Sequence, residues 1–450
     1  MNTESKLITA VDIGTTKIVA MIARQSANGK MQVLGMGEAP SLGVRRGLVV
    51  NLEKTIESIR MATDIAETQA NIKMKDVFVG IAGMHIHSIR NRGYIIIDPR
   101  QDGITQHDVD RLISEAYRIS VEPGDEILHI LPQRYIVDNE PVTGSPVGML
   151  GNRLEADFHI VFSKASSVLN IKKCIARSGL NTIDVCLEPL ASSEAVLTED
   201  EKMVGVAMID IGGGTSDLTV YHEGMVKHTA VIPLGGGIIT SDIKTGLNLM
   251  DKQAERLKVT YGSAIAEIEP ENKIVTIQGI SGRPPKEISC KTLAHIIQAR
   301  MEEIINQLLY QIQASGFYEK LGAGIIVTGG GALLKNLPQL IAFKSGHEVR
   351  VGLPMEFIDC DLEKIPNINN PKYATAVGLL LKGTGFKENM NNKTSPYINL
   401  NQDIEPEPIV TDNRKKTEKE DDSKKASGRN KLQDLVQKVS LLFDVEDHKM

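Results

Sequence analysis

The sequence has 450 residues, which is enough for two or three domains of ordinary size. Its contents of 41% hydrophobic and 24% charged residues are typical of a globular protein with a sizeable core. The net charge of −6 and the absence of Trp argue against a general nucleic-acid-binding protein, so no nucleic-acid partner is expected.

Cysteine spacing and apolar runs limit the possible environments of the chain. The four cysteines are widely separated and form no CxxC pair, which predicts reduced thiols. The apolar segment 7–11 is too short for the core of a signal peptide. The sequence has no run of 18 apolar residues, so no transmembrane helix is expected, and any contact with a membrane would be at its surface.

Strand and helix patterns are mixed through the first 383 residues. Short β-branched runs between turns predict a triplet of strands near the N-terminus, and the same pattern recurs after residue 203. The expected strands are 7–11, 18–23, 31–37, 204–209, 218–221 and 225–231. This repetition indicates two related halves. Apolar residues at helical spacing predict helices over 52–70 and 292–313.

Three glycine-rich turns follow expected strands, at 12–17, 210–217 and 328–334. In the first two, an acidic residue ends a strand and β-branched residues continue after the turn. A dinucleotide-binding fingerprint must open a helix, and no GxxxxGK[ST] sequence is present, so both of these motifs are excluded. The remaining interpretation is a tight hairpin whose backbone N–H groups bind an anion.

The three turns in this order predict a nucleotide phosphate site, although each turn alone could be an ordinary structural hairpin. Asp12 and Asp210 are expected to hold a hydrated Mg²⁺. Donors to the phosphates would be the hydroxyls of the turns and the ammonium of Lys17, which could alternatively be a solvent-exposed turn lysine. The hydroxyls belong to Thr15, Thr16 and Thr215. The glycines expected to let the backbone approach a phosphate are Gly14, Gly212, Gly213, Gly214, Gly329, Gly330 and Gly331.

This ordered set of turns resembles the superfamily of actin, the chaperone DnaK and the sugar kinases. The resemblance implies an α/β, ribonuclease H-like fold with two lobes around a cleft for ATP and Mg²⁺. It also implies that Glu188 orients the attacking water with Asp210 beside it, and that Glu255 and Lys258 contact the ribose and base. Segment 373–378 matches a connecting helix and is expected to pack at a hinge. Any ATPase activity is expected to be slow.

Several segments are similar to the FtsA family in their residues and in their order along the chain, and the similarity runs from about residue 7 to 381. They are 82–85, 144–149, 153–159 and 232–237. The resemblance implies a division protein that polymerises and anchors FtsZ filaments to the inner face of the cytoplasmic membrane at the septum, where it recruits other division proteins. It further implies that Arg300, and with it Lys291, binds the acidic C-terminal peptide of FtsZ. The alternative is that both are solvated helix charges.

The same resemblance implies the domain boundaries. They are 1–84 and 164–203 for subdomain IA, 85–163 for the FtsA-specific subdomain IC, 204–245 and 325–384 for subdomain IIA, and 246–324 for subdomain IIB. From 385 to 430 the chain has few large apolar residues, which predicts a disordered linker. An amphipathic helix is expected over 431–443.

The apolar residues of this last helix form one continuous stripe. They are Leu432, Leu435, Val436, Val439, Leu442 and Phe443. A bilayer interface or a protein groove could cover the stripe, and the FtsA resemblance favours the bilayer. Because basic residues are few here, binding would be mainly apolar and weak for one protomer. Other interpretations of the whole chain are an MreB- or PilM-like scaffold, or a DnaK-like ATPase whose terminal helix binds a protein.

Overall fold

The computed structural model describes residues 7–26, 30–279, 284–354, 358–361, 364–365 and 368–392, with the backbone alone for 385–392. Most of the expected linker and the whole expected helix 431–443 lie outside the described residues. Within the described part, no helix is long and apolar enough to cross a bilayer.

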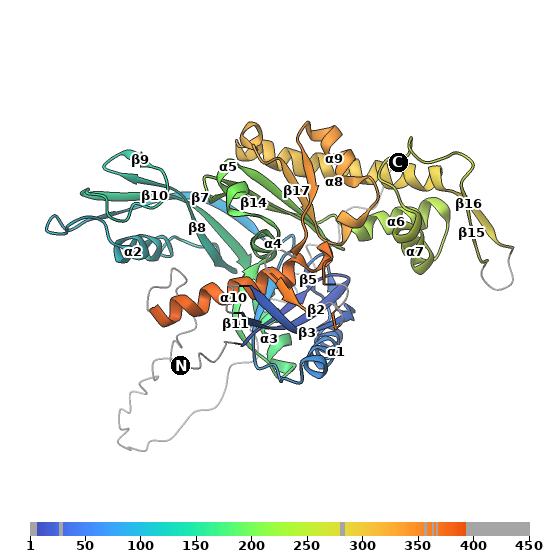
Figure 1. Ribbon diagram of the computed structural model, residues 1–450, viewed down its shortest axis with the longest axis horizontal. Helices are drawn as coiled ribbons and strands as arrows, with labels where there is room; N and C mark the ends of the chain where they lie inside the picture. Colours follow the sequence, from blue (N-terminus) through green and yellow to red (C-terminus); the bar gives the residue numbers. More distant parts are fainter. Residues whose placement is uncertain are drawn as a thin grey trace, which may run out of the picture. The chain divides into compact units, whose positions relative to one another are not determined.

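The first large sheet has the strand order β11-β6-β1-β2-β3-β19. Strands β1, β2 and β3 are antiparallel, and β6, β11 and β19 join them in parallel. Their bounds are β1 Leu7–Ile13, β2 Lys17–Gln25, β3 Met31–Pro40, β6 Asp76–Ile81, β11 Asn181–Leu187 and β19 Ile358–Cys360. Helices α1 (Leu52–Ala70) and α3 (Ala165–Arg177) share a buried apolar core with this sheet (Figure 1).

The second large sheet repeats the arrangement of the first, with the order β14-β13-β12-β17-β18. An antiparallel triplet, β12–β14, is again extended by parallel strands. Their bounds are β12 Val206–Ile211, β13 Ser216–His222, β14 Met225–Ile232, β17 Ile325–Thr328 and β18 Val349–Val351. Both predicted strand triplets are therefore confirmed, and so is the internal repetition.

Two helices join the large sheets. Helix α4 (Glu188–Val196) follows β11, and helix α10 (Ala374–Asn392) follows the short turn η4 (Pro371–Tyr373). One buried core combines residues of α4 and α10 with Met21 of the first sheet and Met208 of the second (Figure 1). Helix α10 continues past residue 384, the expected end of the folded body, and its Gly383 packs against Ile8 and Phe78.

A separate four-stranded sheet, with the order β7-β10-β8-β9, lies between β6 and α3 in the sequence. Its strands are β7 His87–Ile96, β8 Asp125–Val137, β9 Glu140–Val142 and β10 Arg153–Lys164. Helix α2 (Gln106–Ala116) covers one face of this sheet, and Leu112, Phe158 and Leu154 are among the buried residues. Thr105 caps the helix reciprocally with Asp108, which explains why it begins at this position. We call this unit the inserted sheet.

The second half also carries a helical region. It consists of α6 Gly236–Leu247, α7 Asp251–Tyr261, α8 Cys290–Ser315, α9 Leu337–Ser345 and the hairpin β15 Ile274–Ile277 with β16 Lys286–Ser289. The predicted long helix over 292–313 is confirmed as α8, which packs through Ile297, Ile304 and Leu308. Smaller elements are β4 Val44–Arg45, β5 Leu48–Val49, α5 Glu199–Val204, η1 Tyr318–Lys320 and η2 Gly330–Leu333.

Candidate functional site

The first two glycine-rich turns, from different sheets, lie in contact. The β1–β2 turn carries Thr15 and Thr16, and the β12–β13 turn carries Gly213 and Gly214. A Cβ built on Gly213 would lie 2.3 Å from Thr16 Cγ2, and one on Gly214 would lie 2.5 Å from Thr15 Oγ1. Both glycines are therefore required sterically, because any side chain would force the two turns apart.

The third turn closes on the second. Gly329 follows β17 with φ of 82°, in the left-handed region that favours glycine. A Cβ here would lie 2.1 Å from Oδ1 of Asp210. The residues after Gly329 form the short 3₁₀ turn η2 and not the start of a longer helix. The structure thus gathers the three turns that were singled out along the sequence.

Two buried carboxylates end the strands that lead into the turns. Asp12 of β1 has its Oδ2 3.6 Å from Nζ of Lys17, so this lysine faces the cleft. Asp210 of β12 accepts hydrogen bonds at Oδ2 from Ser192 Oγ of α4 (2.7 Å) and Thr375 Oγ1 of α10 (3.3 Å). Burial raises the pKa of both carboxyls, against the opposing charge of Lys17.

Two further acidic side chains lie beside this pair, the buried Asp217 and the partly buried Glu188. Burial raises the pKa of Glu188 well above its ordinary value, and the charges of the aspartates Asp12, Asp217 and Asp210 raise it further. The pKa of Asp217 is likewise raised by burial and by Asp210, although Thr215 Oγ1 donates a hydrogen bond to its Oδ2. Four acidic side chains therefore share one cleft with the ammonium of Lys17, an arrangement that is costly unless another cation binds.

This donor set suits a cation that is bound through water. In the described residues, no three His, Cys, Asp or Glu side chains are placed to ligate a metal directly. Mg²⁺ commonly keeps several of its waters and contacts only one or two protein carboxylates. The buried Asp217 Oδ1 has no hydrogen-bond partner among the described protein atoms, so it can accept a hydrogen bond from such a water.

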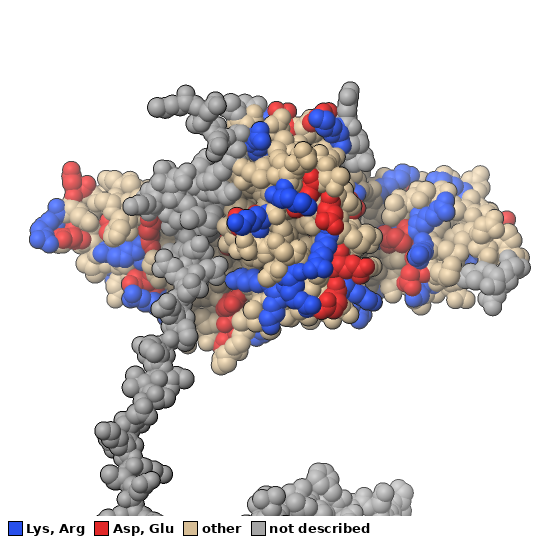
Figure 2. Space-filling model, turned by 90° about the horizontal axis from the view of Figure 1, so that it is seen from below, with Lys and Arg blue, Asp and Glu red and all other residues tan. Residues whose placement is uncertain are grey.

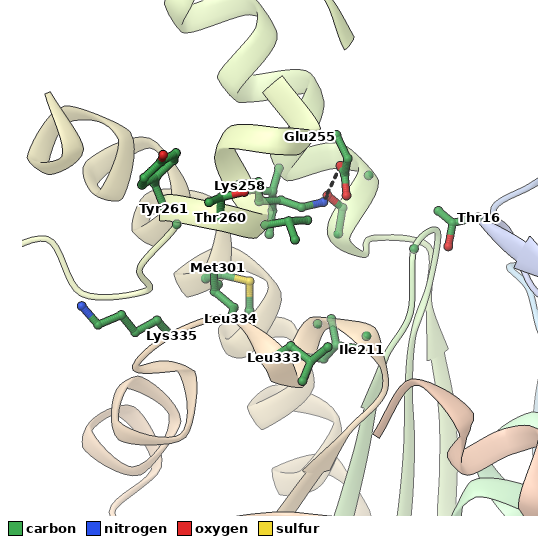
Figure 3. A pocket seen from close by; sticks show the side chains of 18 of the residues that line it. Thr16, Ile211, Glu255, Lys258, Thr260, Tyr261, Met301, Leu333, Leu334 and Lys335 are labelled. Atoms are coloured by element: carbon green, nitrogen blue, oxygen red, sulfur yellow. Dashed lines mark hydrogen bonds and ion pairs between the residues drawn. The ribbon is translucent and has the colours of Figure 1, made fainter. Parts of the chain in front are cut away.

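A cavity of about 330 Å³ continues from the turns into the helical region. Thr16, Gly213 and Gly236 line one end, and Lys335 with Leu334 the other. Figure 3 shows Glu255 and Lys258 of α7 on one wall, with Leu333 and Met301 across the cavity. Its size and mixed polar and apolar walls are those of a site for a small organic ligand.

The predicted pair Glu255 and Lys258 is fixed at the edge of this cavity. Lys258 Nζ donates to Glu255 Oε2 (2.8 Å), to Thr240 Oγ1 (2.8 Å) and to the carbonyl oxygen of Gly236 (2.8 Å). Thr240 also donates to Glu255. The ammonium thus ties α7 to the first turn of α6, and both side chains reach the cavity.

Sequence reasoning missed several residues of the cleft. Ser192 and Thr375 bond to Asp210 and lie 3.0 Å from each other (Oγ to Oγ1), whereas segment 373–378 was expected only to pack at a hinge. Asp217 ends the second turn motif, and its place directly after Thr215-Ser216 in a buried strand was a usable signal. Gly236 and Gly237 were noted only as part of a resemblance, although both line the cavity.

Arg300 and Lys291 lie on α8, outside the residues that line this cavity. The Arg300 guanidinium donates to Asp242 (Nε to Oδ2, 2.6 Å; Nη2 to Oδ1, 3.2 Å) and to Glu303. Lys291 Nζ lies 2.8 Å from Oε1 of Glu271. Both cations already have carboxylate partners on the protein surface, so an acidic ligand would have to compete with them.

Comparison with known proteins identifies the family. A sequence profile described as "Cell division protein FtsA" matches residues 207–378, and one described as "SHS2 domain inserted in FTSA" matches residues 83–162. A cell division protein FtsA of Neisseria meningitidis is 40% identical over 382 residues, 84% of this chain and 91% of the relative. The chain belongs to the FtsA family. FtsA of Pseudomonas aeruginosa is 37% identical (84% and 89% covered), and FtsA of Escherichia coli K12 is 34% identical (85% and 91%).

Solved structures agree on the fold. A type IV pilus PilM–PilN complex matches with a TM-score of 0.62 at 16% identity, covering 84% of this chain and 98% of that one. MreB5 of Spiroplasma citri, solved with AMPPNP, matches with a TM-score of 0.51 at 14% identity, covering 87% and 99%. The predicted actin-like, two-lobed fold with an FtsA-type inserted subdomain is therefore confirmed. The chain is an actin-like cell division protein, and its FtsA membership excludes the MreB-, PilM- and DnaK-like interpretations.

Proposed function

We propose that this FtsA protein binds ATP with Mg²⁺ in the cleft between its two large sheets. The observation that carries the proposal is the meeting of three glycine-rich turns around four carboxylates, three of them buried, beside Lys17. A magnesium nucleotide offers the divalent charge that these carboxylates lack and a phosphate chain for the turn N–H groups.

Each residue has a defined task in this proposal. Asp12 and Asp210 hold the waters of Mg²⁺, and Ser192 and Thr375 orient Asp210 through its Oδ2. The turn hydroxyls and Lys17 contact the phosphates. Glu255 and Lys258 contact the ribose and base from the cavity wall. Glu188, at the start of α4, orients a water toward the terminal phosphate. Hydrolysis, if it occurs, then depends on positioning and electrostatics.

Direct binding measurements test this site. Titration with a fluorescent ATP analogue should give saturable, Mg²⁺-dependent binding. Asp210→Asn should weaken it by at least tenfold, because about 1.4 kcal/mol of charge-assisted contact is a factor of ten. A matched control is Asp359→Asn, at an exposed position on β19. Binding that ignores Mg²⁺, or that is unchanged in Asp210→Asn, would refute the site.

We further propose the role that FtsA family membership supports. The protein polymerises, anchors FtsZ filaments to the inner face of the cytoplasmic membrane at the septum, and recruits other division proteins. Arg300 and Lys291 bind the acidic C-terminal peptide of FtsZ, exchanging their partners Asp242 and Glu271 for peptide carboxylates. Arg300→Glu should abolish peptide binding, while Arg118→Glu, at an exposed position in the turn after α2, should leave it unchanged. An unchanged dissociation constant in Arg300→Glu would remove the assignment.

The proposed membrane anchor is segment 431–443, attached through residues after Asn392. Co-sedimentation with lipid vesicles should pellet the full chain and not a form that ends at Asn392. The cut is placed there because a chain that ended at Gly383 would interrupt α10. Leu435→Glu should prevent pelleting, and Gln437→Glu, on the polar side of the stripe, should not. If the shortened form pellets equally, the anchor lies elsewhere; if the full chain does not pellet, the stripe faces a protein.

A further inference from the structure

A second hollow lies away from the nucleotide cleft, between the inserted sheet and the second large sheet. It has a volume of about 800 Å³. Strands β7, β8, β9 and β10 form one wall, and the β13–β14 hairpin with Phe317 and Lys320 forms the other. We call it the basic groove. It shares no lining residue with the cavity beside Glu255 and Lys258.

The charges of the basic groove are unbalanced. Its five cations are Arg90, Arg92, Arg134, Lys227 and Lys320, and its two carboxylates are Asp157 and Glu223. On the face of the body in Figure 2, by contrast, basic and acidic side chains are interspersed. The whole chain has a net charge of −6, so this excess of positive charge is local. A concave surface of one charge sign focuses the electrostatic potential, which here attracts anions.

On the sheet wall, Arg92 and Arg134 are held in place and keep unused hydrogen-bond donors. Arg92 and Arg134 both bind Asp157, with Nε to Oδ1 at 2.6 Å and Nη2 to Oδ2 at 2.7 Å respectively. Their side chains are nevertheless about half exposed, at 53% and 50%. Because one carboxylate cannot use all ten N–H donors of two guanidinium groups, several remain for a second anion. Because Asp157 already fixes both arginine side chains, binding a second anion costs less conformational entropy.

The opposite wall supplies a buried cation. Lys227 has a side-chain exposure of only 7%, and its Nζ donates to the carbonyl oxygen of Gln133 on β8 (2.7 Å). Burial lowers its pKa, against the opposing effect of Glu223, which lies 3.5 Å away. Its ammonium lies 5.8 Å from the centre of the Phe317 ring, and that of exposed Lys320 lies 5.2 Å from the same ring. Charged and apolar surfaces therefore alternate along this wall.

From these contacts we infer that the basic groove binds an extended acidic segment of a partner protein, with carboxylates on Arg92, Arg134 and Lys320. The groove is much larger than a single phosphate ion needs. Its concave shape, between a sheet and a hairpin, suits a peptide and not a flat lipid surface. Apolar contacts at Pro141, Val142 and Phe317 would take the side chains between the carboxylates. Such a partner would bridge the inserted sheet and the second large sheet.

Fluorescence anisotropy on the full chain tests the inference. The probes are labelled ten-residue peptides with four Glu at different spacings among Val and Leu, and matched peptides with Gln in place of Glu. At least one Glu peptide should bind saturably, and its Gln counterpart should not. Lys320→Glu and Arg134→Glu, both at exposed positions, should each weaken binding about tenfold. Binding should also fall with added salt.

Two control variants test whether the acidic peptide binds in the basic groove itself. Arg100→Glu changes an exposed arginine of the inserted sheet that pairs with Asp98 outside the groove, and it should have no effect. Arg300→Glu should also have no effect, which distinguishes the groove from the proposed FtsZ-peptide site. The inference is overturned if no Glu peptide binds, if both groove variants bind like the wild type, or if Arg100→Glu weakens binding equally. The inference would also be overturned if inorganic phosphate, added at the same total concentration of negative charge as the peptide, displaced the Glu peptide completely.

Discussion

The contact between α4 and α10 allows a quantitative test of how the cleft is built. Gly378 of α10 packs on α4 so closely that an added Cβ would lie 1.7 Å from the carbonyl oxygen of Ala191. Real Cβ atoms do not approach a neighbour more closely than about 3.0 Å. Gly378→Ala therefore requires the two helices to separate by about 1.3 Å at this point, the difference between these two distances.

Two opposing effects set the stability of Gly378→Ala. Overpacking against a backbone atom costs about 3 kcal/mol, the upper part of the usual range. Replacing a helical glycine by alanine returns about 1 kcal/mol. The net loss of about 2 kcal/mol should lower Tm by about 2–3 °C in a thermal unfolding experiment, because the Tm shift per kcal/mol falls as the folded body becomes larger.

The same separation of α4 and α10 should also disturb the hydrogen bonds of the nucleotide site. Ser192 of α4 and Thr375 of α10 lie 3.0 Å apart and both bond to Asp210. A shift of about 1 Å exceeds what a hydrogen bond tolerates, so at least one of these contacts is lost. We expect Gly378→Ala to weaken binding of the fluorescent ATP analogue about fivefold to tenfold, in line with about 1–1.5 kcal/mol for a hydrogen bond.

The matched control is Gly246→Ala in α6. A Cβ there meets only the flexible Cδ1 of Ile296 at 3.2 Å, so Tm should stay the same or rise slightly through helix propensity. If Gly378→Ala has the Tm and ATP affinity of the wild type, the reasoning that places α4 and α10 as the support of Asp210 is refuted.

Two further predictions concern Glu188 and Asp217. Glu188→Gln should leave ATP-analogue affinity within about twofold while lowering phosphate release by about 10²–10⁴-fold, as for other residues that act on the attacking water; equal rates would remove Glu188 from catalysis. Asp217→Asn should raise the Tm of the nucleotide-free protein at pH 7.5, by about 1 °C if about 1 kcal/mol of charge burial is relieved. The pKa of Asp217 is higher in the folded protein than its ordinary value of 3.8, so the folded state binds protons more tightly and loses stability as pH rises from that value through the folded pKa. The advantage of Asp217→Asn should therefore shrink toward pH 4, and an advantage that is equal at both pH values would contradict the assignment.

Much of the fold could be predicted from local patterns. The two strand triplets, helices α1 and α8, and the three glycine-rich turns depend on residue periodicity and turn chemistry within a few positions, and the structure confirms these elements. The resemblance to FtsA likewise rested on contiguous segments, and it was sufficient to identify the family. These features follow from the sequence because their physical causes act between near neighbours.

Only the tertiary structure decided which side chains share the cleft. Ser192 is 18 positions from Asp210, and Thr375 is 183 positions from Ser192, and neither lies in a motif that signals contact with a carboxylate. The requirement for Gly213 and Gly214 could not be predicted from the sequence either, because their neighbours Thr16 and Thr15 belong to the other half of the protein. The basic groove is a similar case, because Arg92, Arg134 and Lys320 meet only after the inserted sheet packs beside β14. Long-range packing of helices and sheets determines these encounters, and no local periodicity records it.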